Sequence, residues 1–124
     1  MSEARRNIVI KLSESAKLAG RDKSDITLIA VSKQQPDERI EESLASGQRI
    51  FGENRVQEAF VRWQARKLEY PTLELHLIGP LQSNKAQAAV ALFDVIHTVD
   101  RPKIATALAR EMTVVGRSLP CFIQ

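Results

Sequence analysis

Short apolar runs recur along the chain at a steady interval, and stretches with a helical spacing of apolar residues separate them. These runs have the length and residue types of strands. They cover residues 27–31, 49–51, 73–77, 94–98 and 119–123. Strands that alternate with helices predict βαβ units, which join into a parallel sheet through right-handed crossovers. We therefore expect an α/β fold.

Helical patterns fill the gaps between the runs. Residues 37–45 follow Pro36 and stop before Gly47, two residues that favour the start and the end of a helix. Further helices are predicted at 54–67, 84–91 and 101–111, and a first helix at about 3–19 precedes all the strands. The residues expected on the inner face of that first helix are Ile8, Leu12, Ala16 and Leu18.

Composition places the chain among ordinary globular proteins. Hydrophobic residues make up 44% and charged residues 27% of the 124 residues, which suits a single domain over residues 1–124. The net charge is +3 and the basic residues are scattered; the nearest approach to a cluster, Arg62, Arg66 and Lys67, fits a solvated helix face. Aromatic residues reach only 5%, too few for stacking platforms, so we expect no nucleic-acid binding.

Cys121 is the only cysteine, which excludes an intrachain disulfide and a cysteine metal cluster. It lies in the apolar stretch 119–123, so we expect it to be a small buried hydrophobic residue, and we expect no metal site. The apolar runs are too short for a signal-peptide core or a membrane span. These features favour a cytoplasmic protein that does not enter a membrane.

Lys33 closes the first predicted strand and is the most informative residue of the chain. If the strand is buried, the amine is held at the rim of a packed sheet. Partial burial would disfavour the ammonium form and lower the pKa of Lys33, and a neutral amine can attack a carbonyl to form a Schiff base. The alternative is a lysine that ends a strand and reaches water through its stem.

Polar and small residues follow the other predicted strands. Ligands of parallel α/β sheets bind beyond the carboxyl ends of the strands, so these residues are candidates for a site. Asn54 is either a ligand contact or the cap of the helix that it begins. Glu53 either pairs with a cation such as Lys33 or is a solvated loop acid. His76 is either a core residue or a side chain that stacks on a ligand.

The last candidates lie at helix starts. Ser83 or Asn84 is a natural N-cap, and the helix start that they form can also hold an anion. Asp100 has the position of another cap, whereas the pattern assigns no role to His97. The sequence contains no HExxH, GxGxxG or Walker A pattern, so these metal and phosphate motifs give no support to either kind of site.

Four segments in order resemble the pyridoxal phosphate homeostasis protein family, whose members look like the barrel domain of alanine racemase standing alone. The segments are VSKQQP at 31–36, FGENRVQEA at 51–59, HLIGPLQSNK at 76–85 and IHTVD at 96–100. The resemblance implies a (β/α)8 TIM-type barrel that holds pyridoxal 5′-phosphate as a Schiff base on Lys33. It also implies that Asn54 and His76 lie near the cofactor ring, and we include Ser83 among the cofactor-binding candidates.

Members of this family are thought to bind, buffer and hand on the vitamin B6 cofactor, with no established turnover. The resemblance therefore implies a binding protein and not an enzyme. One alternative is a pyridoxal-phosphate-dependent racemase or decarboxylase on the same fold. That reaction would need an acid or base opposite Lys33, for which the candidates are His76, Glu53 and Asp100. A second alternative is a structural half-barrel that needs a complementary chain.

The chain departs from the family pattern in two ways. Leu75 stands where the family usually has an aromatic residue, and the sequence ends at the fifth strand whereas family members continue through three more. Five or so strands cannot close an eight-stranded barrel. The first and fifth strands would then be open apolar edges, which predicts a homo-oligomer, aggregation or pairing with a complementary barrel fragment. The later loops hold the cofactor phosphate in this family, so we also expect weak binding.

Overall fold

A computed structural model describes residues 3–124, and the chain divides into two compact units. The first unit runs to Ile29 and also includes Gln34–Gln48. The second unit comprises Ala30–Lys33 and Arg49–Gln124, and it contains every strand of the described residues. All the candidate site residues therefore belong to the second unit.

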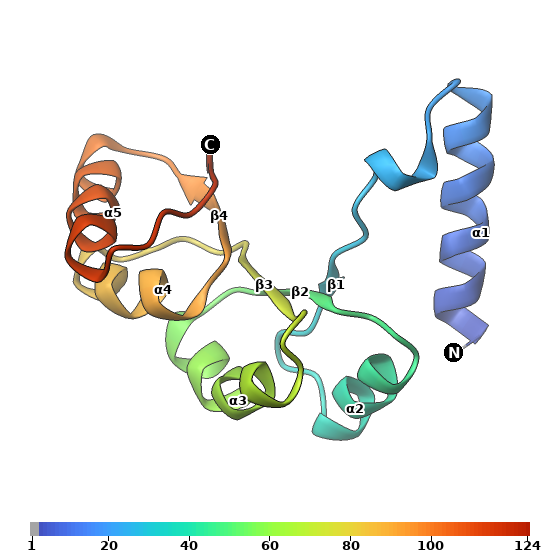
Figure 1. The fold of residues 1–124 in the computed structure, drawn as a ribbon, viewed down its shortest axis with the longest axis horizontal. Coiled ribbons are helices and arrows are strands. Elements are labelled where there is room, and N and C mark those ends of the chain that lie inside the picture. Colours follow the sequence, from blue (N-terminus) through green and yellow to red (C-terminus); the bar gives the residue numbers. More distant parts are fainter. Residues whose placement is uncertain (1–2) are drawn as a thin grey trace. The chain divides into compact units, whose positions relative to one another are not determined.

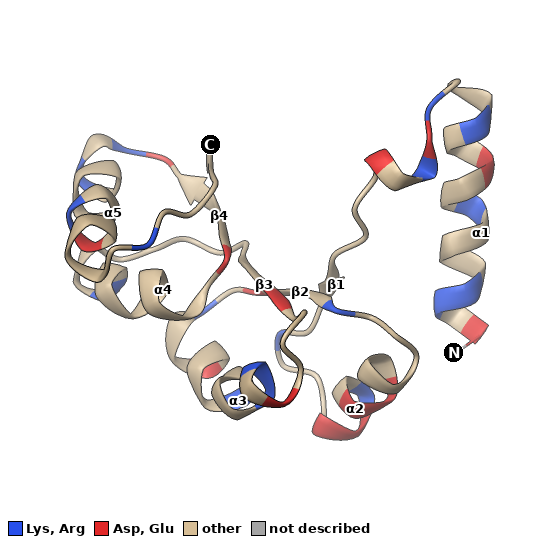
Figure 2. Ribbon diagram, in the orientation of Figure 1, with Lys and Arg blue, Asp and Glu red and all other residues tan. Residues whose placement is uncertain are grey.

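The first unit contains two α-helices, α1 (Glu3–Leu18) and α2 (Asp37–Ala45), and one 3₁₀ turn, η1 (Lys23–Asp25). The bounds of α2 match the prediction. Asp37 and Glu38 lie in its first turn, where carboxylates interact favourably with the helix dipole, and Figure 2 shows this acidic start in red. Gln48 connects the unit by accepting from Arg5 Nε at 3.0 Å and donating to the Leu28 carbonyl at 3.0 Å.

The predicted inner face of α1 is partly wrong. Ala16 is buried, but Ile8 is 50% exposed and Leu18 is 90% exposed. Leu18 lies two residues beyond Ala16, which turns its side chain by about 200° around the helix axis and away from that face. The less exposed positions are Arg5, Val9, Leu12, Ser13 and Ala16, and these recur at helical spacing.

The second unit is a parallel five-stranded sheet in the order β1-β2-β3-β4-β5, which confirms the predicted α/β class. Its strands are β1 (Ala30–Val31), β2 (Ile50–Glu53), β3 (Glu74–Leu77), β4 (Val95–Val99) and β5 (Cys121–Ile123). Its helices are α3 (Val56–Glu69), the 3₁₀ turn η2 (Ser83–Lys85), α4 (Ala86–Leu92) and α5 (Pro102–Val115). Figure 1 shows α3, α4 and α5 on one side of the sheet.

The core of this unit lies between the sheet and those helices. Phe51 of β2 packs on Trp63 of α3 with ring centroids 4.6 Å apart, and both side chains are almost fully buried. Phe51 pairs with Leu75 in the register of β2 and β3, so Leu75 faces the helices as well. Other core residues of these layers are Ala59, Leu77, Ala89, Val90, Ile96, Ile104 and Leu108. Burial of these side chains is the main stabilising contribution to the unit.

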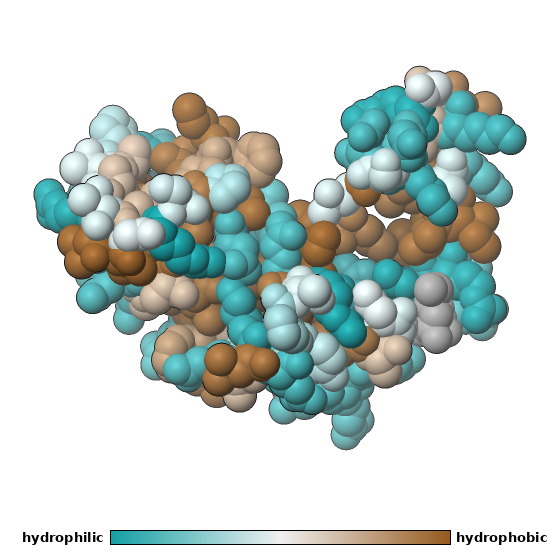
Figure 3. Space-filling view, viewed as in Figure 1, coloured by the Kyte–Doolittle hydropathy of each residue, from teal (hydrophilic) through white to brown (hydrophobic). Residues whose placement is uncertain are grey.

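The two edges of the sheet are β1 and β5, as predicted, and apolar side chains are exposed on both. Val31 is 50%, Phe122 56% and Ile123 92% exposed. Figure 3 shows apolar surface in brown where Figure 1 marks the C-terminus. The predicted buried first strand and the predicted burial of Cys121 are therefore wrong. The reason is common to both: each lies in an edge strand with a neighbour on only one side.

The basic side chains of α3 are not solvated as expected. Arg66 donates to the Arg62 carbonyl at 2.6 Å, and Lys67 donates to the Leu92 carbonyl at 2.6 Å and to Asp94 at 2.9 Å. Asp94 also accepts from the Leu75 amide and from Arg117, which ties β3 to the segment after α5. The charged ends of Arg66 and Lys67 thus donate hydrogen bonds to acceptors of the fold, while the stems of such long side chains can cover apolar surface.

The expected caps also differ from the structure. The residue before α3 is Arg55, not Asn54, and the one before α5 is Arg101, not Asp100. Asp100 instead accepts from Arg101 Nη1 at 2.6 Å. Ser83 and Asn84 lie inside η2, so neither has the extended backbone that a capping side chain requires.

Candidate functional site

The predicted site residues follow neighbouring strands of the second unit. Lys33 comes shortly after β1, and Asn54 follows β2 directly. Because these strands are hydrogen-bonded neighbours in a parallel sheet, both residues lie at the carboxyl edge. His76 is one strand further along, inside β3, and pairs with Gly52 of β2 in the register. Lys33 and Asn54 therefore follow, and His76 lies within, three adjacent strands of the sheet.

Lys33 is exposed, so the partial burial predicted for it is wrong. The first strand is short and lies at the sheet edge, which leaves its end open. Within residues 3–124 the Lys33 amine has no hydrogen bond and no ion pair. The side chain that the sequence singles out is thus accessible and unpaired in the described part of the chain.

The backbone of Asn54 is closely packed against the loop that follows β3. Gly79, in the loop after β3, approaches so closely that a Cβ atom added there would lie 2.3 Å from the Asn54 carbonyl oxygen. The adjacent strands are also joined by a bond from the Ile78 amide to the Glu53 carbonyl at 2.9 Å. The Asn54 side chain forms no hydrogen bond within residues 3–124, so its amide is available to a ligand.

His76 is 6% exposed, and both of its ring nitrogens are engaged. Nε2 lies 2.8 Å from Glu74 Oε1, and Nδ1 lies 2.8 Å from Nε2 of His97. A carboxylate can only accept, so His76 Nε2 carries the proton that Glu74 accepts, and in the neutral ring Nδ1 accepts from His97. These bonds fix the orientation of the ring and leave only its face for a ligand.

His97 is a site residue to which the sequence assigned no role. It contacts the His76 ring at 5.1 Å between centroids and stacks on Phe122 of β5 at 4.9 Å. Burial, followed by the nearby His76, lowers the pKa of His97. His76 pairs with Val95, so His97 lies diagonally across the strand pair. That register is the signal that would have connected the two histidines.

Glu53 pairs with a cation, as one sequence alternative predicted, but that cation is Arg62 at 3.7 Å and not Lys33. The other alternative, a solvated loop acid, is wrong. It is 1% exposed and accepts from Trp63 Nε1 at 3.0 Å and from Ser32 Oγ. Side chains alternate along a strand, and Phe51 already contacts Trp63, so Glu53 faces the same helix. Of the other candidate bases, Asp100 pairs with Arg101 and His76 is engaged at both nitrogens.

Ser83 lies in a different place from the other candidates. It lines an open groove of about 530 Å³ between η2 and α5, together with Lys103, Thr106 and Arg110. Lys33, Asn54 and His76 are not among the residues that line this groove.

The described residues offer neither a metal site nor a membrane-spanning helix. Residues 3–124 contain no group of three His, Cys, Asp or Glu side chains that could hold a metal ion. In the same range, every helix is too short or too polar to cross a bilayer.

Comparison with known proteins supports the resemblance. No protein-family model matches the chain. A pyridoxal phosphate homeostasis protein of Vibrio cholerae is 42% identical over 120 residues, which cover 95% of this chain and 51% of that protein. The Escherichia coli protein of the same name is 48% identical over 99 residues, covering 79% of this chain and 42% of the relative.

A solved structure agrees with these relatives. PipY of Synechococcus elongatus, determined with pyridoxal phosphate bound, is 46% identical and superposes with a TM-score of 0.74. The match covers 89% of this chain and 51% of PipY. The chain spans about half the length of the proteins that it matches. By sequence and by fold, it is a relative of the pyridoxal phosphate homeostasis proteins.

Proposed function

We propose that this chain binds pyridoxal 5′-phosphate and holds it as a Schiff base on Lys33. The observation that carries the proposal is the exposed and unpaired amine of Lys33 at the carboxyl edge of a parallel sheet, beside Asn54. The cofactor-bound PipY structure, at 46% identity, supports the choice of ligand. The cofactor supplies the aldehyde that a Schiff base requires, and the residues near Lys33 determine the orientation of that aldehyde relative to the amine.

The residues present fit the reaction that attachment requires. Attachment would require the deprotonated amine of Lys33 to attack the aldehyde carbon, with a C=N bond replacing the C=O bond and the oxygen leaving as water. The amine has no competing carboxylate partner within residues 3–124, so no ion pair has to break first. Asn54 can donate from its amide to a polar atom of the ring, and His76 can contact the ring only through its face.

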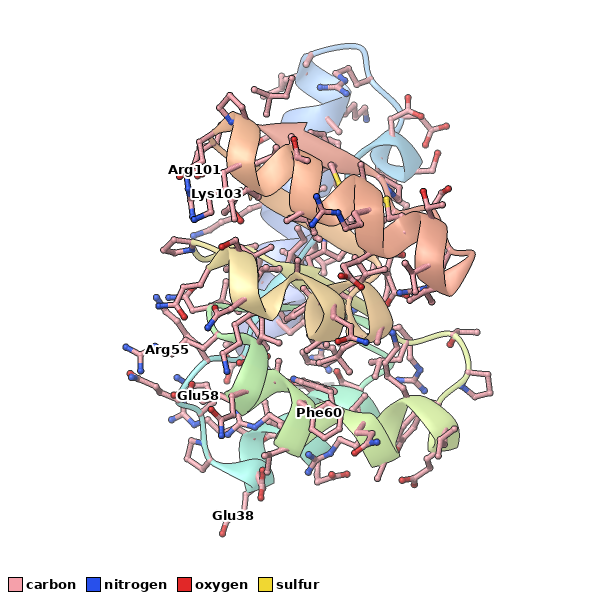
Figure 4. All side chains as sticks on the ribbon, turned by 90° about the vertical axis from the view of Figure 1, so that its left-hand side faces the viewer. Glu38, Arg55, Glu58, Phe60, Arg101 and Lys103 are labelled. Carbon is pink, nitrogen blue, oxygen red and sulfur yellow. The ribbon has the colours of Figure 1, made fainter. Side chains whose placement is uncertain are left out.

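Binding of the cofactor phosphate has weaker support from the structure than attachment of the aldehyde to Lys33. Arg55, Arg101 and Lys103 follow β2 and β4 and project toward one side in Figure 4. Arg55 lies near Glu58 at 3.8 Å and Arg101 pairs with Asp100, so part of this positive charge is already neutralised. Ser83 stays a predicted anion contact, although the groove that it lines with Lys103 is not lined by Lys33, Asn54 or His76. Each hydrogen bond to a charged group is worth about 1.5–3 kcal/mol, so few such bonds mean weak affinity.

Binding without turnover is the activity that these residues favour. A racemase or decarboxylase needs an acid or base that is free to exchange a proton with the substrate. Glu53 faces α3, Asp100 pairs with Arg101, and both nitrogens of His76 are bonded. All three groups are therefore already bonded to other residues of the protein.

Association through the sheet edges stays a prediction. Its support is the exposure of Val31 on β1 and of Phe122 and Ile123 on β5. Apolar edges of this kind pair readily with another chain.

An absorbance titration tests the proposed function. Adding pyridoxal 5′-phosphate to the protein should produce the visible band of a protonated Schiff base, and Lys33→Ala should not produce it. Equal bands for both proteins would overturn the assignment of Lys33.

A further inference from the structure

The end of β2 holds a buried negative charge that the proposed function does not explain. Glu53 is 1% exposed, and three side chains converge on its Oε2 atom. Ser32 Oγ donates at 2.5 Å, Trp63 Nε1 donates at 3.0 Å, and Arg62 Nη1 lies at 3.7 Å. A carboxylate is costly to bury without such partners, so this cluster is a built feature of the fold.

The cluster fixes the backbone immediately before Lys33. Arg62 Nη1 donates at 2.5 Å to the Ser32 carbonyl, which belongs to the peptide bond that joins Ser32 to Lys33. The Ser32 amide donates to the Gly52 carbonyl at 3.0 Å. With its hydroxyl on Glu53, Ser32 is therefore held at its amide, its side chain and its carbonyl.

The backbone immediately after Lys33 is also constrained. Gln34 has φ of 59°, and it is the one non-glycine residue with positive φ in residues 3–124. This left-handed conformation is uncommon for a residue with a Cβ atom, and such conformations collect at functional sites. The chain thus turns directly behind a lysine whose preceding peptide is already fixed.

We infer that Glu53 and Arg62 are positioning residues that hold the Lys33 peptide in the orientation needed for Schiff-base formation. The inference rests on the proposed function. Glu53 holds Arg62 by charge, Arg62 holds the Ser32 carbonyl, and the Lys33 side chain starts from a backbone that does not need to be ordered during the reaction. Such preorganisation accelerates a reaction by removing the entropy cost of alignment. Neither residue touches the reacting atoms.

Glu53→Gln tests the inference because it preserves the shape of the side chain and removes the charge that holds Arg62. The rate of appearance of the Schiff-base band should fall roughly 10- to 100-fold at a fixed excess of pyridoxal 5′-phosphate. Amide hydrogen exchange, measured without cofactor, should become faster in peptides that cover Lys33. Glu69→Gln is the matched control, because Glu69 is exposed at the end of α3, the helix that carries Arg62, and its rate should equal that of the parent.

A merely structural role would lower the urea midpoint of Glu53→Gln and leave the rate unchanged in the folded protein. An unchanged rate under conditions where the variant is fully folded would overturn the inference. If Glu53→Gln does not fold, Arg62→Lys decides. A lysine keeps the charge, but its ammonium is on a shorter side chain than Nη1, the nitrogen that donates to the Ser32 carbonyl and lies 3.7 Å from Glu53, so the rate should also fall. A parent-like rate for folded Arg62→Lys would overturn the inference as well.

The same measurements separate this inference from the proposed function. If the parent forms no Schiff base, the proposed function fails. If the parent forms it on Lys33 and both variants react at the parent rate, the function stands and the positioning role is wrong.

Discussion

The ends of β1 and β3 each carry a predicted cofactor residue, but in opposite surroundings. Lys33, after β1, is exposed and has no side-chain partner within residues 3–124. His76, in β3, is 6% exposed and is bonded to Glu74 and His97. One is an exposed side chain without a partner on a hydrogen-bonded backbone, and the other is a ring held at both nitrogens.

This difference assigns separate roles to Lys33 and His76 in the proposed site. A group that forms a covalent bond has to reach its target, so it gains from a free side chain on an ordered backbone. A group that supports a flat ring gains from a fixed orientation. Substitutions should therefore separate effects on cofactor attachment, at β1, from effects on stability, at β3.

The largest loss of stability is expected from Gly79→Ala, which tests how tightly the β3 end is packed. The added Cβ atom would lie 2.3 Å from the Asn54 carbonyl oxygen, so backbone has to shift. Overpacking of this kind costs about 1–3 kcal/mol, measured as the free energy of unfolding in urea. Gly20→Ala is the control for the Asn54 signals: its φ of 68° makes an alanine strained and lowers stability too, but nothing lies within 4 Å of the added Cβ, so the amide signals of Asn54 should not change. Unaltered Asn54 signals in Gly79→Ala would contradict the close contact.

An intermediate effect is expected at His76 and almost none at Lys33. His76→Ala leaves Glu74 and His97 without a shared partner, which should cost about 1–2 kcal/mol because both are only partly buried. Lys33→Ala should change the free energy of unfolding by less than about 0.5 kcal/mol. Urea unfolding with an unchanged slope measures both. Equal losses would remove the contrast between the two strand ends.

The smallest effect is the pH dependence from His97. Burial, and then the electrostatic effect of the nearby His76, lowers the pKa of His97 from 6.5, so below pH 6.5 the unfolded chain binds the proton more readily than the folded protein. Stability is therefore complete above pH 6.5 and declines as the pH falls through the folded pKa. Melting temperatures between about pH 8 and about pH 5 should show this decline. His97→Gln should lose that component, and an identical profile for the variant would contradict the assignment.

Local pattern predicted the parts of the fold that depend on nearby residues. The bounds of α2 follow from Pro36 and Gly47, and strand and helix alternation gave the parallel sheet. The apolar run alone indicates a buried first strand, whereas the exposure of Val31 follows from the edge position that the resemblance predicted for that strand.

The environment of each site residue was harder to predict than its position. Lys33, Asn54 and His76 lie at or near strand ends as expected. The burial of Glu53 depends on Trp63 and Arg62 of the following helix, and the partner of His76 depends on the register of β4. These are pairings between elements, which the spacing of residues along one strand does not contain.

Borohydride reduction followed by peptide mapping tests the central claim most directly. The protein is mixed with pyridoxal 5′-phosphate, the C=N bond is reduced to a stable amine, and the modified lysine is located by mass spectrometry. The adduct should lie on Lys33, should be absent from Lys33→Ala, and should persist in Lys85→Ala, which removes another exposed lysine of the same unit. An adduct spread evenly over the exposed lysines, or retained in Lys33→Ala, would contradict the account.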